Sequence, residues 1–328
     1  MEIRGPGRAV LITGAAGFIG SHLVDRLLAR GERLVGLDNF DSFYDPAIKR
    51  ANLADALRHP QFRLVEGDIR DEALLSSLLA EHGVDRIVHL AARAGVRPSI
   101  EQPALYADVN VRGTTMVFEA ARRAGINRVV WASSSSVYGG NTKVPFCEDD
   151  PVEHPVSPYA ATKRACELIA STYHHLFGID LIGLRFFTVY GPRQRPEMAI
   201  HLFTRAIAED RPIPFFGDGS SRRDYTYVDD CVDGVIAALD KGRGLRVYNL
   251  GESATTSLSE LVALLGEALG KKPRLDRKPA QPGDVEVTFA DIGRARRELG
   301  YDPQIPVPEG IRRFVAWYRE HHLSADRS

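Results

Sequence analysis

Tyr159 and Lys163, in the segment SPYAATK, are side chains whose types and spacing could move a proton. A spacing of four residues places both on one face of a helix. An ordinary phenol, with a pKa of about 10, is a poor base at neutral pH, but a neighbouring ammonium favours the phenolate. Such pairs also arise by chance in many helices. The serine run 133–136 at the end of a predicted strand, shortly before this helix, favours the chemical interpretation.

A glycine-rich turn precedes the first predicted helix. Gly14, Gly17 and Gly20 lie in VLITGAAGFIGSHL, where glycines permit a tight turn and let backbone N–H groups approach a pyrophosphate. The spacing is GxxGxxG and not GxGxxG, so the glycine triplet alone is weak evidence for a dinucleotide site. Asp38 follows Gly17 by 21 residues, at the end of the next strand, where an acid accepts hydrogen bonds from ribose hydroxyls. An acid there disfavours a 2′-phosphate, so we predict NAD rather than NADP.

Two further strand ends could contact the same dinucleotide. GDIRD would bring Asp68 and Ile69 to the adenine, although a strand end with a helix cap at Asp71 explains the motif equally well. The small residues of HLAARAG (89–95) would let the backbone approach the cofactor, and a tightly packed strand end is the alternative.

Composition excludes several classes of function. The 328 residues carry 42 Lys and Arg against 43 Asp and Glu, a net charge of -1 that lacks the basic surplus of a nucleic-acid binder. Three scattered cysteines, Cys147, Cys166 and Cys231, predict neither a disulfide framework nor a metal site. The N-terminus lacks a signal-peptide pattern, and no run of 18 apolar residues predicts a membrane span. We therefore expect a cytoplasmic protein without a membrane partner.

The order of elements predicts an α/β fold with a doubly wound parallel sheet. Short apolar runs alternate with helix-length segments through the first half of the chain. The predicted strands are 9–13, 33–38, 62–67, 86–91, 128–133 and 181–187. An amphipathic helix follows the glycine turn, and long helices are predicted at 103–124 and 158–177.

The second half of the chain changes character and predicts a smaller domain. Pro, Gly, Arg and aromatic residues dominate 190–227 and indicate binding loops. Helices are predicted at 228–240, 258–269 and 308–322, with a strand at 246–250 and a loop at 273–285. Chains longer than about 250–300 residues usually divide their core. We expect a dinucleotide-binding domain from 1–186 and 225–250, and a smaller α/β substrate domain from 187–224 and 251–328.

Together these motifs resemble the extended short-chain dehydrogenase/reductase superfamily, and within it the nucleotide-sugar epimerases and dehydratases. The resemblance covers nearly the whole chain. Its motifs are TGAAGFIGSHL, LDNF, GDIRD, HLAARAGVR, NVRG, SSSSVYG, SPYAATK, LRFFTVYGP, RRDYTYVDD and PGDV.

This resemblance implies a Rossmann fold with bound NAD and assigns roles by position. Tyr159 would be the acid/base, Lys163 would orient the nicotinamide ribose, and Ser134 would hydrogen-bond the sugar hydroxyl that is oxidised. Asn110 matches a buried, cofactor-adjacent asparagine of the family. The implied cofactor contacts are Gly14, Gly17, Phe18, Ile19, Gly20, Asp38, Asn39, Asp68, Ile69, Leu90, Ala91, Ala92, Asn110, Tyr159 and Lys163.

Four stretches resemble the UDP-glucuronate 4-epimerases in particular: DNFDSFYDPAIKR, AGVRPSIEQP, WASSSSVYGGNTKVPF and LRFFTVYGPRQRPEMA. That group carries a threonine at the position of Thr188, and the resemblance implies that Arg195 faces the hexuronate carboxylate. A guanidinium can hold a planar carboxylate through two parallel hydrogen bonds. Alternatively, Arg193 and Arg195 are solvated loop residues or bind the phosphates of UDP.

The resemblance implies a UDP-sugar substrate whose other contacts are Arg97, Ser135, Ser136, Phe216, Arg223 and Asp284. Gln281 departs from the family pattern, which often has an arginine there, so Arg193 or Arg222 would hold part of the nucleotide. The Asp-Glu pair of the dehydratases is absent, because this chain has Ser135 and Ser136 there. UDP-glucose 4-epimerase, UDP-glucuronate decarboxylase and a catalytically idle NAD-binding protein are the other candidates. The helices predicted at 103–124 and 158–177 match those that form a four-helix bundle in family homodimers, which we expect here.

Overall fold

A parallel sheet of seven strands organises the computed structural model, which describes residues 8–279 and 286–323. Its strands are β1 (Ala9–Thr13), β2 (Arg33–Asp38), β3 (Phe62–Glu66), β4 (Val84–His89), β5 (Arg128–Ala132), β6 (Asp180–Phe186) and β11 (Leu245–Leu250). Their order across the sheet is β11-β6-β5-β4-β1-β2-β3. From β1 the chain builds the sheet outward through β2 and β3, and from β4 it builds outward in the opposite direction through β5 and β6. The predicted doubly wound sheet is therefore confirmed.

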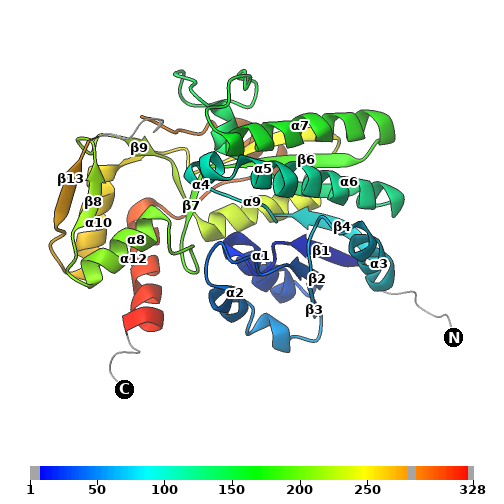
Figure 1. Cartoon of the computed structure of the whole chain (residues 1–328), viewed down its shortest axis with the longest axis horizontal. Helices are drawn as coiled ribbons and strands as arrows, with labels where there is room; N and C mark the ends of the chain where they lie inside the picture. The colour runs from blue at the N-terminus through cyan, green and yellow to red at the C-terminus, as the bar shows by residue number, and fades with distance from the viewer. Residues whose placement is uncertain (1–7, 280–285, 324–328) are drawn as a thin grey trace.

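Helices cover both faces of this sheet (Figure 1). They are α1 (Phe18–Ala29), α2 (Pro46–Asn52), α3 (Glu72–His82), α6 (Gly113–Arg123), α7 (Pro158–Phe177) and α9 (Val228–Lys241). Side chains alternate along β1: Val10 and Ile12 join the core that includes α1 and α9, whereas Ala9 and Leu11 join the core beneath α3, α6 and α7. Burial on both faces explains why the strands are continuous apolar runs.

Local signals define helix α7, which carries Tyr159 and Lys163. The Ser157 hydroxyl at its N-cap accepts a hydrogen bond from the backbone N–H of Ala160, and Pro158 occupies the first helical position. Gly178 ends the helix with a left-handed φ of 68°. Serine, proline and glycine at these positions are the ordinary start and stop signals of a helix, so the predicted bounds are confirmed.

The helix predicted at 103–124 is not a regular α-helix along its whole length. A short α5 (Pro103–Tyr106) runs into a π-helical segment, η2 (Ala107–Arg112), and then into α6. Asn110 is buried inside the π segment. π-Helical turns often occur beside functional sites. The predicted helical run is confirmed, but helical periodicity in the sequence does not distinguish a π segment from an α-helix, so the π segment was not predicted.

Most of the remaining elements gather at one end of the sheet, where Figure 1 shows α8, α10 and α12 beside β8 and β13, whereas α11 packs against β11 and α9. The remaining elements are β7 (Thr188–Tyr190), α8 (Ala199–Ala208), β8 (Ile213–Phe216), β9 (Arg222–Arg223), β10 (Tyr225–Tyr227), β12 (Thr256–Ser257), α10 (Leu258–Leu269), β13 (Leu275–Lys278), α11 (Gly293–Leu299) and α12 (Val307–Tyr318). The loop predicted at 273–285 contains β13, which pairs with β8. All four β13 residues are exposed and three are charged, so no apolar pattern indicated a strand.

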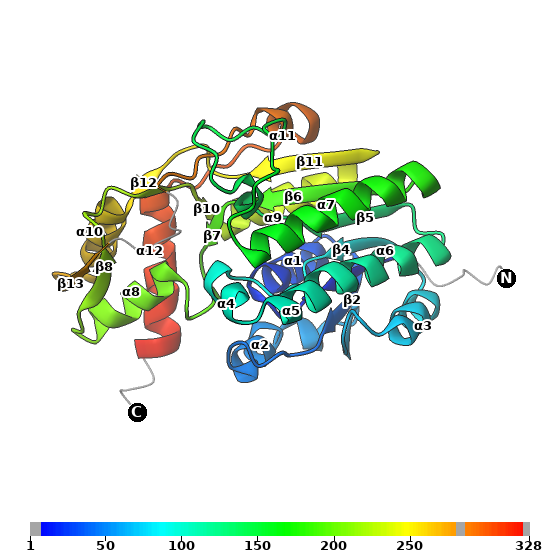
Figure 2. The same ribbon diagram turned by 45° about the horizontal axis from the view of Figure 1, so that its top comes forward.

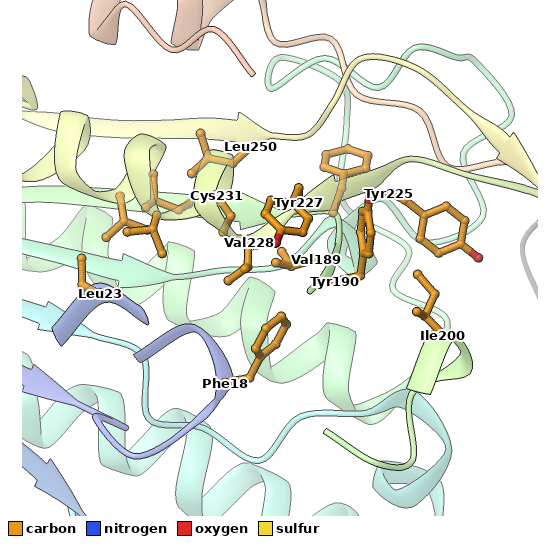
Figure 3. Close-up of a cluster of buried hydrophobic side chains, with 14 of the residues drawn as sticks. Phe18, Leu23, Val189, Tyr190, Ile200, Tyr225, Tyr227, Val228, Cys231 and Leu250 are labelled. Carbon is orange, nitrogen blue, oxygen red and sulfur yellow. The ribbon is translucent and has the colours of Figure 1, made fainter. Parts of the chain in front are cut away.

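One apolar core connects this end of the molecule to the large sheet. Figure 3 shows Phe18 and Leu23 of α1 in the same cluster as Tyr190, Tyr227 and Ile200. The two apolar cores therefore lie on opposite faces of the large sheet, and one of them continues into this end of the molecule. No helix in the described part of the chain has both the length and the apolar character needed to cross a membrane.

Candidate functional site

A cavity of about 320 Å³ opens at the carboxyl ends of the strands, beside the neighbouring strands β1 and β4, between which the strand order reverses. This is where open α/β sheets bind their ligands. Many residues selected from the sequence line it: Gly14, Gly17, Phe18, Ile19, Gly20, Asp38, Asn39, Asp68, Ile69, Leu90, Ala91, Ala92, Ser134, Tyr159, Lys163 and Arg195.

The glycine turn closes one wall of this cavity. Gly14 has a left-handed φ of 70°, and a Cβ atom there would lie 2.8 Å from the backbone nitrogen of Ala91. A Cβ atom on Gly20 would overlap the carbonyl oxygen of Gly14. The turn leads into α1, whose first turn carries no acidic residue. Its free N–H groups can therefore receive a phosphate.

Two carboxylates stand at the far end of this wall. The Asp38 carboxylate accepts hydrogen bonds from the backbone N–H groups of Ala16 (3.0 Å) and Phe40 (2.9 Å), and its burial raises the pKa of this group. Hydrogen bonds from Arg70 are the main cause that lowers the pKa of Asp68 to about 2. The Asn39 amide also donates to Asp68 (3.0 Å). The two acids thus hold the surrounding turns together at the adenosine end predicted for the cofactor.

The three residues predicted to be catalytic line the opposite end of the cavity. The Lys163 ammonium is buried and donates to the carbonyl of Ala132 at the end of β5 (2.8 Å). The Ser134 hydroxyl accepts from the backbone N–H of Ser136 (3.1 Å), in the 3₁₀ turn η3 (Ser135–Tyr138). The Tyr159 ring packs edge-on against Tyr106, with centroids 6.3 Å apart. This end of the cavity therefore presents a phenol, an ammonium and a hydroxyl together.

The loop after β2 supplies a part of the cavity that the sequence reasoning did not select. Phe43 lies beneath two guanidinium groups, with Arg93 at 5.2 Å and Arg195 at 5.7 Å from the ring centroid. Arg93 also pairs with Asp41 of this loop. The buried Lys49 donates to the carbonyl of Asp41 (2.8 Å). The aromatic residues of DNFDSFY and the arginine in HLAARAG were the available signals.

His89, at the end of β4, is buried behind the glycine turn. Its ring nitrogens lie 2.7 Å from the Thr13 hydroxyl and 3.0 Å from the Thr114 hydroxyl. Complete burial lowers the pKa of this imidazole to about 3. The ring is therefore neutral near pH 7 and serves as a hydrogen-bonded support beneath the turn.

Several predicted residues lie outside the cavity lining. Asn110 is buried, and its side-chain amide accepts a hydrogen bond from the backbone N–H of Arg93 (2.8 Å) and donates one to the carbonyl of Arg93 (3.0 Å). The amide also donates to the Thr162 hydroxyl (3.1 Å). It thereby holds the strand end that lines the cavity. Arg97, on α4 (Val96–Glu101), stacks on Phe216 at 5.8 Å.

The other predicted substrate contacts that the structure describes also lie outside the cavity lining. Ser135 and Ser136 lie in η3, and Thr188 begins β7 between the cavity residues Phe187 and Val189. The Arg223 guanidinium donates to the carbonyl of Arg222 (2.9 Å). Asp284 and Gln281 lie outside the described residues.

The arginines considered as substitutes for a phosphate ligand have protein partners. Arg193 pairs with Asp25 of α1 (2.7 Å). Arg222 donates to both the hydroxyl (2.8 Å) and the carbonyl (2.7 Å) of Thr255. Arg195 lines the cavity and pairs with Glu197 (3.3 Å).

Comparison with known proteins agrees with this geometry. A family model described as GDP-mannose 4,6 dehydratase matches residues 11–314. UDP-glucuronate 4-epimerase 3 of Arabidopsis thaliana is 46% identical over 330 residues, which cover 95% of this chain and 76% of the relative. The chain belongs to the extended short-chain dehydrogenase/reductase family.

Other relatives and solved structures match this chain over nearly their whole length. UDP-glucuronate 4-epimerase of Thermodesulfobacterium geofontis is 41% identical, with 95% of this chain and 96% of the relative covered. The UDP-glucuronic acid 4-epimerase of Bacillus cereus, solved with UDP-glucuronic acid and NAD, superposes with a TM-score of 0.89. Its identity is 35%, over 96% of this chain and 99% of that one. The dTDP-glucose 4,6-dehydratase DesIV of Streptomyces venezuelae has the same TM-score at 36% identity, over 96% and 98% of the two chains.

Proposed function

We propose that this protein is an NAD-dependent 4-epimerase that interconverts UDP-glucuronate and UDP-galacturonate. The observation that carries the proposal is that Arg195 lines the same cavity as Ser134, Tyr159 and Lys163. A guanidinium near the acid/base group suits a sugar with a carboxylate close to the carbon that reacts. Relatives named UDP-glucuronate 4-epimerase support this choice of substrate.

The cavity fits NAD at both ends. The glycine turn and the N-terminus of α1 line the cavity through Gly14, Gly17 and Phe18, where backbone N–H groups could receive a pyrophosphate. Asp38 would hold the adenosine ribose, and Asp68 and Ile69 would lie at the adenine. When bound, NAD would accept a hydride from the sugar C4 and later return it.

The residues of this chain would move the proton and hold the sugar. Tyr159 as the phenolate would take the proton of the C4 hydroxyl, and the Ser134 hydroxyl would hydrogen-bond the same oxygen. Lys163 would favour the phenolate and orient the nicotinamide ribose. Tyr159 would give the proton back to the 4-keto oxygen after the sugar turns its other face, which inverts C4.

Arg195 would also protect the 4-keto sugar. A 4-keto hexuronate is a β-keto acid and loses carbon dioxide when its carboxylate stands perpendicular to the ring. Hydrogen bonds from Arg195 and Thr188 would hold the carboxylate away from that orientation. A decarboxylase would need the opposite arrangement, and a 4,6-dehydratase would need the acid pair that Ser135 and Ser136 replace.

Incubation with UDP-glucuronate and, separately, with UDP-glucose tests the function, with products resolved by NMR. We expect UDP-galacturonate from the first substrate. UDP-galactose from the second substrate alone would identify a glucose epimerase, and UDP-xylose from the first would identify a decarboxylase. Either result would contradict the proposal.

We further propose that the protein forms a homodimer through α7 and the helical run α5-η2-α6, which lie side by side in Figure 2. Three apolar side chains of α7 are exposed: Leu168 (55%), Leu176 (66%) and Phe177 (47%). Burial of such side chains favours association. A monomeric mass in solution at micromolar concentration would contradict this proposal. The division into two domains and the cytoplasmic location stay predictions.

A further inference from the structure

A buried ion pair lies directly behind the serines of the cavity. Glu167 of α7 accepts two hydrogen bonds from Arg185 of β6, each 2.9 Å long. Both side chains are only 3% exposed, and neither lines the cavity. Burial of an ion pair carries a large desolvation cost, so stability alone is a weak reason for its presence.

The pair fixes the charge of Glu167. Burial alone would raise the pKa of the Glu167 carboxyl, but the hydrogen bonds and charge of Arg185, with Ser133 and Arg164, hold this pKa below its usual value. The group is therefore a carboxylate at neutral pH. A carboxylate can only accept hydrogen bonds.

That constraint fixes the direction of the Ser133 hydroxyl. Its oxygen lies 2.8 Å from Oε1 of Glu167, so the hydroxyl must donate its single proton to the carboxylate. Ser133 is 2% exposed and also lines the cavity. Toward the cavity it can therefore offer only lone pairs, as an acceptor.

Glu167 also helps to set the position of the end of β5. Lys163 and Glu167 are one helical turn apart on α7, and they bond to consecutive residues of the strand, Ala132 and Ser133. Ser134 comes next and faces the cavity beside Tyr159. The strand end is thus attached to the helix that carries the proposed acid/base group.

We propose that Glu167, held by Arg185, is a positioning residue that turns Ser133 into a hydrogen-bond acceptor for an amide or hydroxyl donor of the bound NAD or sugar. The proposal deepens the proposed epimerase function and rests on it, because these are the ligands of that reaction. Ser133 is the group that touches the ligand, and Glu167 acts through it.

Ser133→Ala is the primary test, because it removes the acceptor and leaves the buried pair intact. We expect either the affinity for NAD to fall or the KM for the UDP-sugar to rise by about fivefold to tenfold, the size of effect that one neutral hydrogen bond supports. A loss in NAD affinity, measured by calorimetry without sugar, assigns the donor to the cofactor. A rise in KM for the UDP-sugar at unchanged NAD affinity assigns it to the sugar. NAD affinity, KM and kcat all within twofold of the wild type would overturn the proposal.

Glu167→Gln tests the direction of the hydroxyl, because a glutamine amide can donate to Ser133 and release its proton toward the cavity. We expect Glu167→Gln to change the affinity for NAD or the KM for the UDP-sugar as much as Ser133→Ala does. The double variant should show no further change in either quantity. Additive losses would contradict the mechanism. If Glu167→Gln does not fold, Ser133→Ala still decides the acceptor role.

Ser171→Ala is the matched control, since Ser171 is an exposed serine on α7, one turn beyond Glu167. We expect it to match the wild type. The calorimetric measurement does not require turnover, so an inactive wild type would contradict the epimerase proposal without deciding the role of Ser133.

Discussion

Arg195 is the residue on which the choice of substrate depends. It lines the cavity and stacks on Phe43, whereas its neighbour Arg193 is paired with Asp25. Arg195 also pairs with Glu197 (3.3 Å), but of the two arginines it is the one that lines the cavity and can meet a ligand there. The Phe43 ring already restricts the Arg195 guanidinium, which lowers the entropy cost of ordering this group around a carboxylate.

Arg195→Ala should therefore raise KM for UDP-glucuronate by about tenfold to a hundredfold, the size of a lost hydrogen bond between charged groups. UDP-glucose has no carboxylate and should bind the variant about as well as it binds the wild type. Steady-state kinetics on both substrates measure the difference. Equal losses on the two substrates would point to a phosphate contact instead.

Tyr159→Phe should lower kcat by about a hundredfold to ten-thousandfold, because the phenol oxygen is the proposed proton acceptor. NAD should still bind, since the glycine turn and Asp38 are unchanged. Turnover and NAD affinity are measured on the same preparation. Tyr173→Phe is the control, because Tyr173 lies on the same helix and its hydroxyl bonds to Glu119 (3.2 Å), away from the cavity. Normal activity in Tyr159→Phe would contradict the mechanism.

The loop between β7 and α8 is the element that positions Arg195. Two contacts attach it to α1: His22 bonds to the carbonyl of Pro192 (2.9 Å), and Arg193 pairs with Asp25 (2.7 Å). Arg193 has a φ of 62°, a left-handed conformation that costs a residue with a side chain some free energy. The contacts to α1 offset this cost and hold the loop in place.

Asp25→Asn should release the loop and raise KM for UDP-glucuronate about threefold to tenfold, with a smaller change in kcat. Asp233→Asn is the matched control, because it removes the partner of Arg26, the neighbouring arginine of α1 (3.1 Å). Kinetics of both variants, with circular dichroism to confirm folding, test this. If Asp25→Asn and Asp233→Asn behave alike, the loop does not depend on this ion pair.

At the scale of the whole molecule, buried acids lie where the two ends of the structure join. Asp224 and Asp230 are buried, and Oε2 of Glu252 is buried without a hydrogen-bond partner. Burial, with the charges of Asp230 and Asp224, raises the pKa of Glu252 to about 8. Burial also raises the pKa of Asp224 to about 6. Between about pH 4 and its folded pKa, each of the two groups, Asp224 and Glu252, keeps a proton in the folded state that it loses on unfolding.

Stability should consequently fall as the pH rises. The contribution of these groups is complete below their unfolded pKa values, near pH 4, and is lost as the pH passes the folded values of about 6 and about 8. We expect the free energy of unfolding in urea to fall by on the order of 2 kcal/mol between pH 5.5 and pH 8.5. Glu252→Gln should remove much of this fall. Glu267→Gln, on the exposed side of α10, should not.

Local features of the fold and of the catalytic pair could be predicted from the sequence, because neighbours along the chain produce them. The glycine turn precedes α1, and Ser157 and Gly178 delimit the helix that presents Tyr159 and Lys163. The apolar strands predicted the sheet, since parallel strands are buried on both faces. The π segment that contains Asn110 was not predicted, because helical spacing does not reveal it.

The sequence by itself determined the doubly wound sheet, the glycine turn and the spacing of the proposed acid/base pair. Only the tertiary structure decided which arginine reaches the cavity, because Arg193 and Arg195 differ in partners that come from α1 and from the loop after β2. The tertiary structure also decided that Ser133 donates a hydrogen bond to Glu167 and that Arg93 forms an ion pair with Asp41. These contacts join segments 34 to 168 residues apart, and no local spacing in the sequence encodes them.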